Sequence, residues 1–182
     1  MVFDFFKKKK KDDPLDDLDN LVLSKMKPGY LVDYDDKTYT VTGKNYYQWE
    51  EGGRTDEWEL KLGSETFFLE RSEEDGEVEW SLCRKLPLSA LEGDIAKHII
   101  KYEDPPETVI CNGVTFHFEE DDIGQYFKGS GGDPLSFVVW DFCDESGEQS
   151  LSIEQWGETK FDVALGFEVE EYQFTNILPA GA

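Results

Sequence analysis

The chain has 182 residues, of which 41 are Asp or Glu and 18 are Lys or Arg, so its formal net charge is −23. This charge excludes a general nucleic-acid-binding protein, which needs a basic face to displace counterions from phosphates. No apolar run approaches the roughly 20 residues that cross a bilayer, and an aromatic content of 14 % indicates a packed core rather than an acidic disordered chain.

Residues 1–24 form a polarised head, in which Phe3, Phe5 and Phe6 precede five lysines and five aspartates follow. The three phenylalanines and the lysines (Lys7, Lys8, Lys9, Lys10 and Lys11) are candidates for peripheral contact with an anionic membrane. The aspartates oppose that attraction, and a soluble frayed tail is the alternative. Leucines at helical spacing predict a short helix in this head, ending before Pro28.

Residues 25–86 predict a first β lobe. Short period-two runs rich in strand formers occur at residues 31–34, 38–42, 46–49, 57–62, 66–70 and 78–82. Turn residues separate these runs, and Asp75-Gly76 is the favoured pair for a two-residue hairpin. We therefore expect an antiparallel meander.

Residues 87–106 predict one linking helix. Ser89 and Glu92 have the spacing of a capping box, and Leu91, Ile95 and Ile99 share one helical face. The prolines at positions 105 and 106 end the helix.

Residues 107–178 predict a second β lobe, with strands at residues 109–111, 114–118, 124–127, 136–142, 151–156 and 160–165 and a last strand within 167–175. The order and spacing of these strands follow those of the first lobe, which indicates a degenerate internal duplication. The alternative is that two unrelated meanders have the same pattern of strands and turns. The predicted fold is mainly β: two related antiparallel β-meander lobes (a partly open barrel or sandwich) joined by one α-helix.

The first lobe carries a family resemblance. Residues 28–34 read PGYLVDY and residues 37–43 read KTYTVTG, which resembles the opening of the bacterial family called domain of unknown function 4178. The tryptophan-bearing strand at 56–60 also fits, whereas Phe67-Phe68-Leu69 stands where the family usually has a tryptophan. The resemblance spans roughly residues 25–165. It implies an accessory or adaptor protein near the inner membrane, because members tend to accompany genes for membrane-stress proteins, small membrane proteins and polyamine synthases.

The chain offers no strong catalytic or metal motif. Cys111, His117 and Cys143 lack the paired spacing of zinc ligands, and the acidic turn at residues 144–148 lacks the full ligand series of a calcium loop, so a solvated hairpin is the favoured interpretation. No nucleophile lies in a recognisable elbow, and the glycine-rich segment at 129–133 has no Walker lysine. We therefore expect no enzyme activity, no catalytic residues and no cofactor.

Aromatic residues are denser than a core needs. Tyr46, Trp49, Trp58 and Trp156 are candidates for a docking surface that acidic residues surround and that suits a basic protein or a polyamine. The alternative is burial between the lobes and the helix.

These features predict a non-enzymatic acidic adaptor with a protein partner. Three isolated cysteines and the lack of a signal-peptide pattern indicate the cytoplasm, with peripheral contact at the inner membrane as an extension. The alternative hypothesis is a sensor that binds a cation, such as a polyamine or calcium, between the two lobes.

Overall fold

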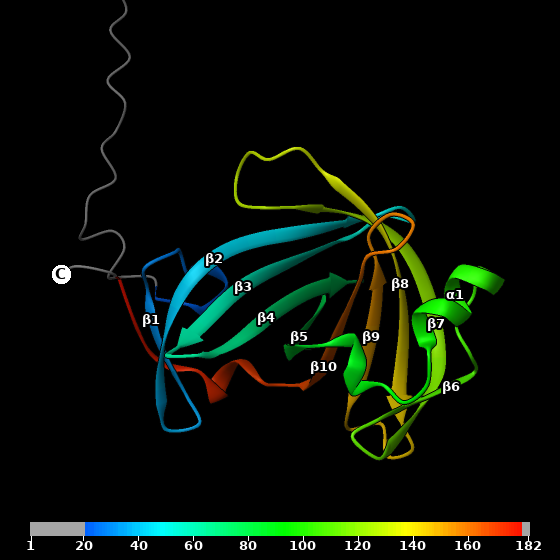
Figure 1. Ribbon diagram of the computed structural model, residues 1–182. Helices are drawn as coiled ribbons and strands as arrows, with labels where there is room; N and C mark the ends of the chain where they lie inside the picture. Colours follow the sequence, from blue (N-terminus) through cyan, green and yellow to red (C-terminus); the bar gives the residue numbers. More distant parts are fainter. Residues whose placement is uncertain (1–20, 180–182) are drawn as a thin grey trace, which may run out of the picture.

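The computed structural model describes residues 21–179 and is mainly β, as the sequence predicts. One continuous antiparallel sheet of 11 strands contains two meanders, and the described chain has a single α-helix (Figure 1).

The first meander consists of β1 (Leu31–Tyr34), β2 (Lys37–Trp49), β3 (Arg54–Leu62), β4 (Glu65–Glu74) and β5 (Glu77–Leu86). Asp75 and Gly76 both have positive φ values, and Glu74 pairs directly with Glu77. The predicted two-residue hairpin is therefore confirmed.

The second meander consists of β6 (Thr108–Cys111), β7 (Val114–Phe127), β8 (Leu135–Asp144), β9 (Ser150–Gln155) and β10 (Phe161–Glu168). It repeats the first in order: a four-residue strand, a tight turn and then a long strand. The prediction of two related meander lobes is confirmed at this level.

Two seams join the meanders into an eight-stranded barrel. Strand β5 pairs with β10, and the second half of β2 pairs with the second half of β7, from Tyr46 opposite Phe127 to Trp49 opposite Gly124. The strands β1, β6 and β11 (Thr175–Leu178) extend the sheet beyond the barrel.

Two pairs of predicted strands are each one long strand. Residues 38–42 and 46–49 both belong to β2, whose pairing with β3 shifts between Val41 and Gly43. Residues 114–118 and 124–127 both belong to β7, whose pairing with β8 shifts between Phe118 and Glu120. Such a bulge bends a strand without ending it. Along one edge, β2 therefore pairs first with β1 and then with β7, and β7 pairs first with β6 and then with β2.

The helical predictions need correction at their boundaries. Gly93 has a φ of +84°, so the helix α1 (Ile95–Tyr102) begins after it, with Asp94 accepting a hydrogen bond from Lys97 N at 3.2 Å. The predicted capping-box residues precede the helix, in and after a 3-10 turn, η2 (Leu88–Ala90).

Both ends of the described chain also differ from expectation. Where the predicted head helix was to end, residues 23–25 form only a 3-10 turn, η1 (Leu23–Lys25), and Val22 before it is extended. The part of that helix before residue 21 lies outside the described residues. The predicted strand within 167–175 is wrong: a 3-10 turn, η3 (Glu171–Gln173), precedes β11, which pairs with β1.

The two large hydrophobic cores lie on the outer face of the barrel. On the first meander, Trp58 and Leu60 pack beneath residues of the two terminal segments, such as Met26 and Phe174. On the second, α1 covers the sheet (Figure 1). Because side chains alternate along a strand, the residues between these apolar ones face the interior.

Membrane-spanning helices are not found in the described residues, where every helix is too short and too polar to cross a bilayer.

We predict that Gly124→Ala destabilises the barrel at the β2–β7 seam. A Cβ at this position would lie 2.9 Å from the Phe137 ring and 3.0 Å from Trp49, and overpacking of this kind costs about 1–3 kcal/mol. Urea denaturation measures the loss. Gly131→Ala is the matched control, since nothing lies within 4 Å of its Cβ; equal stability of the two variants would contradict the prediction.

Candidate functional site

The barrel encloses a cavity of about 410 Å³ that residues from all eight of its strands line. Three kinds of side chain dominate the lining: carboxylates, hydroxyls and aromatic rings. They include Glu70, Asp141, Glu154, Ser72, Ser81, Ser152, Tyr47 and Trp49. No Lys or Arg is among the lining residues, so the cavity has a strongly acidic wall.

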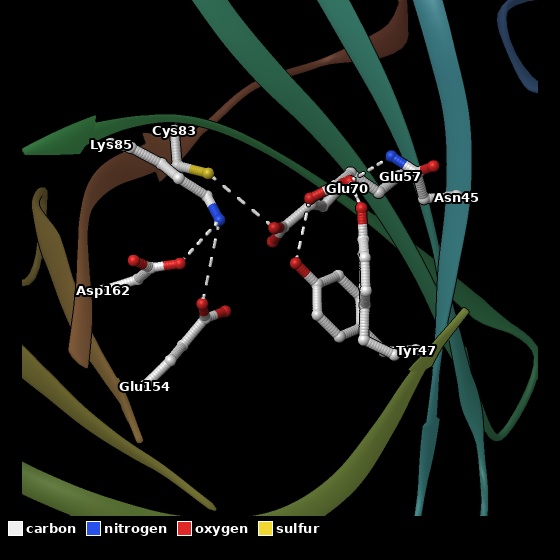
Figure 2. A network of polar contacts seen from close by, with 9 residues as sticks. Asn45, Tyr47, Glu57, Glu70, Cys83, Lys85, Glu154 and Asp162 are labelled. Carbon is white, nitrogen blue, oxygen red and sulfur yellow. Dashed lines mark hydrogen bonds and ion pairs between the residues drawn. The ribbon is translucent and has the colours of Figure 1, made fainter. Parts of the chain in front are cut away.

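Glu57 on β3 is the most deeply buried carboxylate, at 1 % exposed. It accepts hydrogen bonds from Asn45 Nδ2 at 2.7 Å, Tyr47 Oη at 2.9 Å and Tyr126 Oη at 3.4 Å. Figure 2 shows Asn45 and Tyr47 reaching it from β2, and Tyr126 comes from β7. These three hydrogen bonds satisfy the buried carboxylate and join β2, β3 and β7.

Glu70 on β4 lies directly opposite Glu57 in the sheet. Its carboxylate contacts are weak: Ser81 Oγ at 3.3 Å and Cys83 Sγ at 3.7 Å. Burial in the barrel raises the pKa of Glu70 to about 8, and the carboxylates of Glu57 and Glu154 add to this effect. Burial and Glu70 together also raise the pKa of Cys83, so this thiol is not an activated nucleophile.

Lys85 on β5 supplies the cation nearest to these acids. Its Nζ lies 3.4 Å from Asp162 Oδ2 and 3.9 Å from Glu154 Oε2 (Figure 2). Burial opposes the charge on Lys85, but the surrounding carboxylates outweigh burial, so the pKa of Lys85 is raised.

Glu154 is 8 % exposed, and its Oε2 has no hydrogen-bond partner. Burial raises the pKa of Glu154 to about 7, although Lys85 acts against the shift. Asp141 faces the same cavity from β8 and accepts a hydrogen bond from Ser152 Oγ; burial raises its pKa to about 6.

The cavity opens toward the turn between β8 and β9. Residues 147–149 and 166–168 line both the cavity and a groove of about 700 Å³. Phe67, Arg84 and Leu165 complete the groove. The shared lining gives a small molecule a route from solvent into the barrel.

The metal candidates from the sequence do not converge. Within residues 21–179, no three His, Cys, Asp or Glu side chains are placed to hold a metal ion together. His117 lies opposite Cys143, whose thiol instead donates to Glu119 at 2.8 Å. In the acidic turn, Asp144 accepts hydrogen bonds from Ser146 Oγ and Gln149 N, which lower its pKa.

The predicted docking residues separate in the structure. Trp58, predicted as part of an exposed surface, is instead fully buried and donates from its indole to Met26 O at 2.9 Å. Trp49 and Trp156 are half-buried and pack with Phe137 around the inner cluster of Tyr47. Tyr46 is half-buried, stacks on Phe127 and has Arg54 over its ring. The predicted membrane-contact residues 3–11 lie outside the described residues.

The inward carboxylates are what the sequence reasoning missed. It considered as sites only the acids in predicted turns, whereas Glu57, Glu70 and Glu154 lie within strands. Each is next to an apolar residue of an outer core, namely Trp58, Leu69 and Ile153. The available signal was a strand whose apolar residues occupy one face while a carboxylate occupies the other.

Comparisons with known proteins match most of the described chain to one family. The model of the family described as "Domain of unknown function (DUF4178)" matches residues 27–171. A protein of Aquifex aeolicus (strain VF5), named "Uncharacterized protein", is 29 % identical over 157 residues, which cover 86 % of this chain and 85 % of that protein. No solved structure matches. The chain belongs to the DUF4178 family.

We predict that the ligand-free protein becomes less stable as pH rises from about 5 to about 8. Glu70 and Glu154 have raised folded-state pKa values, of about 8 and about 7. Unfolding therefore releases their protons in this window, and stability falls with rising pH. Urea denaturation at pH 6 and pH 8 measures the effect.

Glu70→Gln removes one of these groups, so we expect the variant to be more stable than the wild type at pH 8, by on the order of 1 kcal/mol. Glu74→Gln on the same strand is the control, because Glu74 is exposed. If the two variants respond alike, general surface repulsion rather than the barrel interior determines the pH dependence.

Proposed function

We propose that this DUF4178 protein binds a small organic amine, such as a polyamine, inside its barrel. This is the sensor hypothesis from the sequence, now assigned to a specific cavity between the two meanders. The observation that carries it is Glu154 Oε2, which is buried, lines the cavity and accepts no hydrogen bond, with its ion-pair partner Lys85 Nζ as far away as 3.9 Å. A buried carboxylate oxygen that accepts no hydrogen bond is costly, and a bound ammonium group would supply one.

The chemistry of the cavity wall suits an alkylammonium ion. Carboxylates supply charge-assisted acceptors, and the rings of Tyr47 and Trp49 supply apolar and cation–π contacts for the methylene chain and the ammonium head. A volume of about 410 Å³ is in the range of small-molecule sites. The ammonium group of Lys85 itself lies beside Glu154 and Asp162, which is the same kind of interaction within the chain.

The spacing of the acids favours an organic amine over calcium. Calcium needs six to eight oxygens around one point, and no such group occurs among residues 21–179. Carboxylates distributed along a wall instead suit a ligand whose charge is spread along a chain.

The adaptor hypothesis and the expected absence of enzyme activity stay predictions. Burial of Trp58 removes one residue from the surface that was to contact a partner. The cavity, in contrast, has a defined wall and an opening, so amine binding has the stronger structural support.

We predict that 1,4-diaminobutane and spermidine raise the melting temperature of the full-length protein, because a ligand that binds only the folded state stabilises it. Titration calorimetry then measures affinity, and Glu154→Gln should weaken binding at least tenfold. Glu92→Gln is the control, since Glu92 is exposed and lies outside the cavity. Calcium chloride should have no comparable effect.

The proposal fails if neither amine binds the wild type at millimolar concentration. It also fails if Glu154→Gln and Glu92→Gln bind with wild-type affinity.

A further inference from the structure

We propose that the cavity exchanges a proton for its ligand: Glu70 is protonated while the cavity is empty and loses that proton when an amine binds. This inference rests on the proposed function and adds its regulation, because exchange makes binding depend on pH. It starts from the pairing of two acids within the barrel.

Glu57 and Glu70 are cross-strand partners on the same face of β3 and β4. Two ionised carboxylates directly opposite one another repel, and one of them then keeps a proton. Glu57 accepts three hydrogen bonds, two of them at 2.9 Å or shorter, whereas the two donors near Glu70 are a hydroxyl at 3.3 Å and a thiol at 3.7 Å. Glu70 is therefore the partner with the weaker hydrogen bonds, and the shared proton is assigned to it.

The groups around Glu70 on the other strands are mostly acidic. The titratable and charged side chains that face it are Tyr47 on β2, Glu57 on β3, Cys83 and Lys85 on β5, Asp141 on β8, Glu154 on β9 and Asp162 on β10. Lys85 is the only cation in this set, and its Nζ pairs with Asp162 and Glu154. Within residues 21–179 no ion pair reaches Glu70, which leaves a proton as its means of neutralisation. The raised pKa of Glu70, about 8, agrees with this assignment.

The exchange balances in charge. An alkylammonium ion enters with all its N–H bonds intact, and the O–H bond of the Glu70 carboxyl breaks. The proton leaves to a buffer base through the opening beside residues 147–149, which line the cavity. For the ammonium group that binds beside Glu70, one positive charge enters and one leaves. The second ammonium group of 1,4-diaminobutane brings a further positive charge, which the other carboxylates of the cavity wall neutralise.

Titration calorimetry with 1,4-diaminobutane tests the exchange on the full-length protein. Binding at pH 7 in phosphate, imidazole and Tris, whose ionisation enthalpies differ, should show release of about one proton per ligand bound. Affinity should rise up to about tenfold per pH unit between pH 6 and 7.5. In Glu70→Gln most of the proton release should be lost, leaving the part that comes from Glu154, whereas Glu74→Gln, exposed on the same strand, should release as much as the wild type.

A second measurement needs no ligand. The infrared spectrum of the wild type at pH 7 should contain the C=O band of a buried protonated carboxyl, which Glu70→Gln removes and added 1,4-diaminobutane diminishes. Its absence, or binding whose heat does not depend on the buffer, overturns the exchange and leaves amine binding intact. Failure of both amines to bind overturns the proposed function and the exchange with it.

Discussion

Closure of the barrel depends on one buried carboxylate, Glu57. The β2–β7 seam has only four paired positions, against six at the β5–β10 seam. Glu57 lies behind this shorter seam and accepts donors from both of its strands, Asn45 and Tyr47 on β2 and Tyr126 on β7. Asn45 continues the chain of bonds, because its Oδ1 accepts from Gly129 N just beyond β7. Removing this charge would leave buried donors without a partner on both sides of the seam.

The barrel carries its buried acids inside, next to the inner cluster of Tyr47, and its two large apolar cores outside. Each meander packs its apolar alternate residues outward, against the terminal segments on one side and α1 on the other. Once two outer cores stabilise the sheet, the inner face is free to carry acids. The neighbours of Glu57 on that face, Glu70 and Glu154, then share a confined space with few cations. The acidic cavity is thus a consequence of how the two lobes bury their hydrophobic residues.

Strand identity was predictable from sequence because period-two patterns and turn pairs such as Asp75-Gly76 are local signals. The bulges in β2 and β7 were not predictable from sequence. The residues that follow Val41 and Phe118 resemble the end of a strand, but in the structure they only shift the register. The predicted start of α1 was wrong because Gly93 adopts a positive φ, which the capping-box spacing does not reveal. The cavity was beyond local reasoning: Glu57 and Tyr126 are far apart in sequence and meet only when the seam closes.

The same carboxylates connect stability and binding. Acids that repel one another make the empty barrel less stable at neutral pH. The repulsion acts inside the barrel, and the short β2–β7 seam must stay paired against it. A cation in the cavity removes the repulsion and stabilises the closed seam at the same time. In the function we propose, ligand and proton are therefore alternative means of neutralising one site. The amine concentration and the pH would then act on the protein through a single equilibrium.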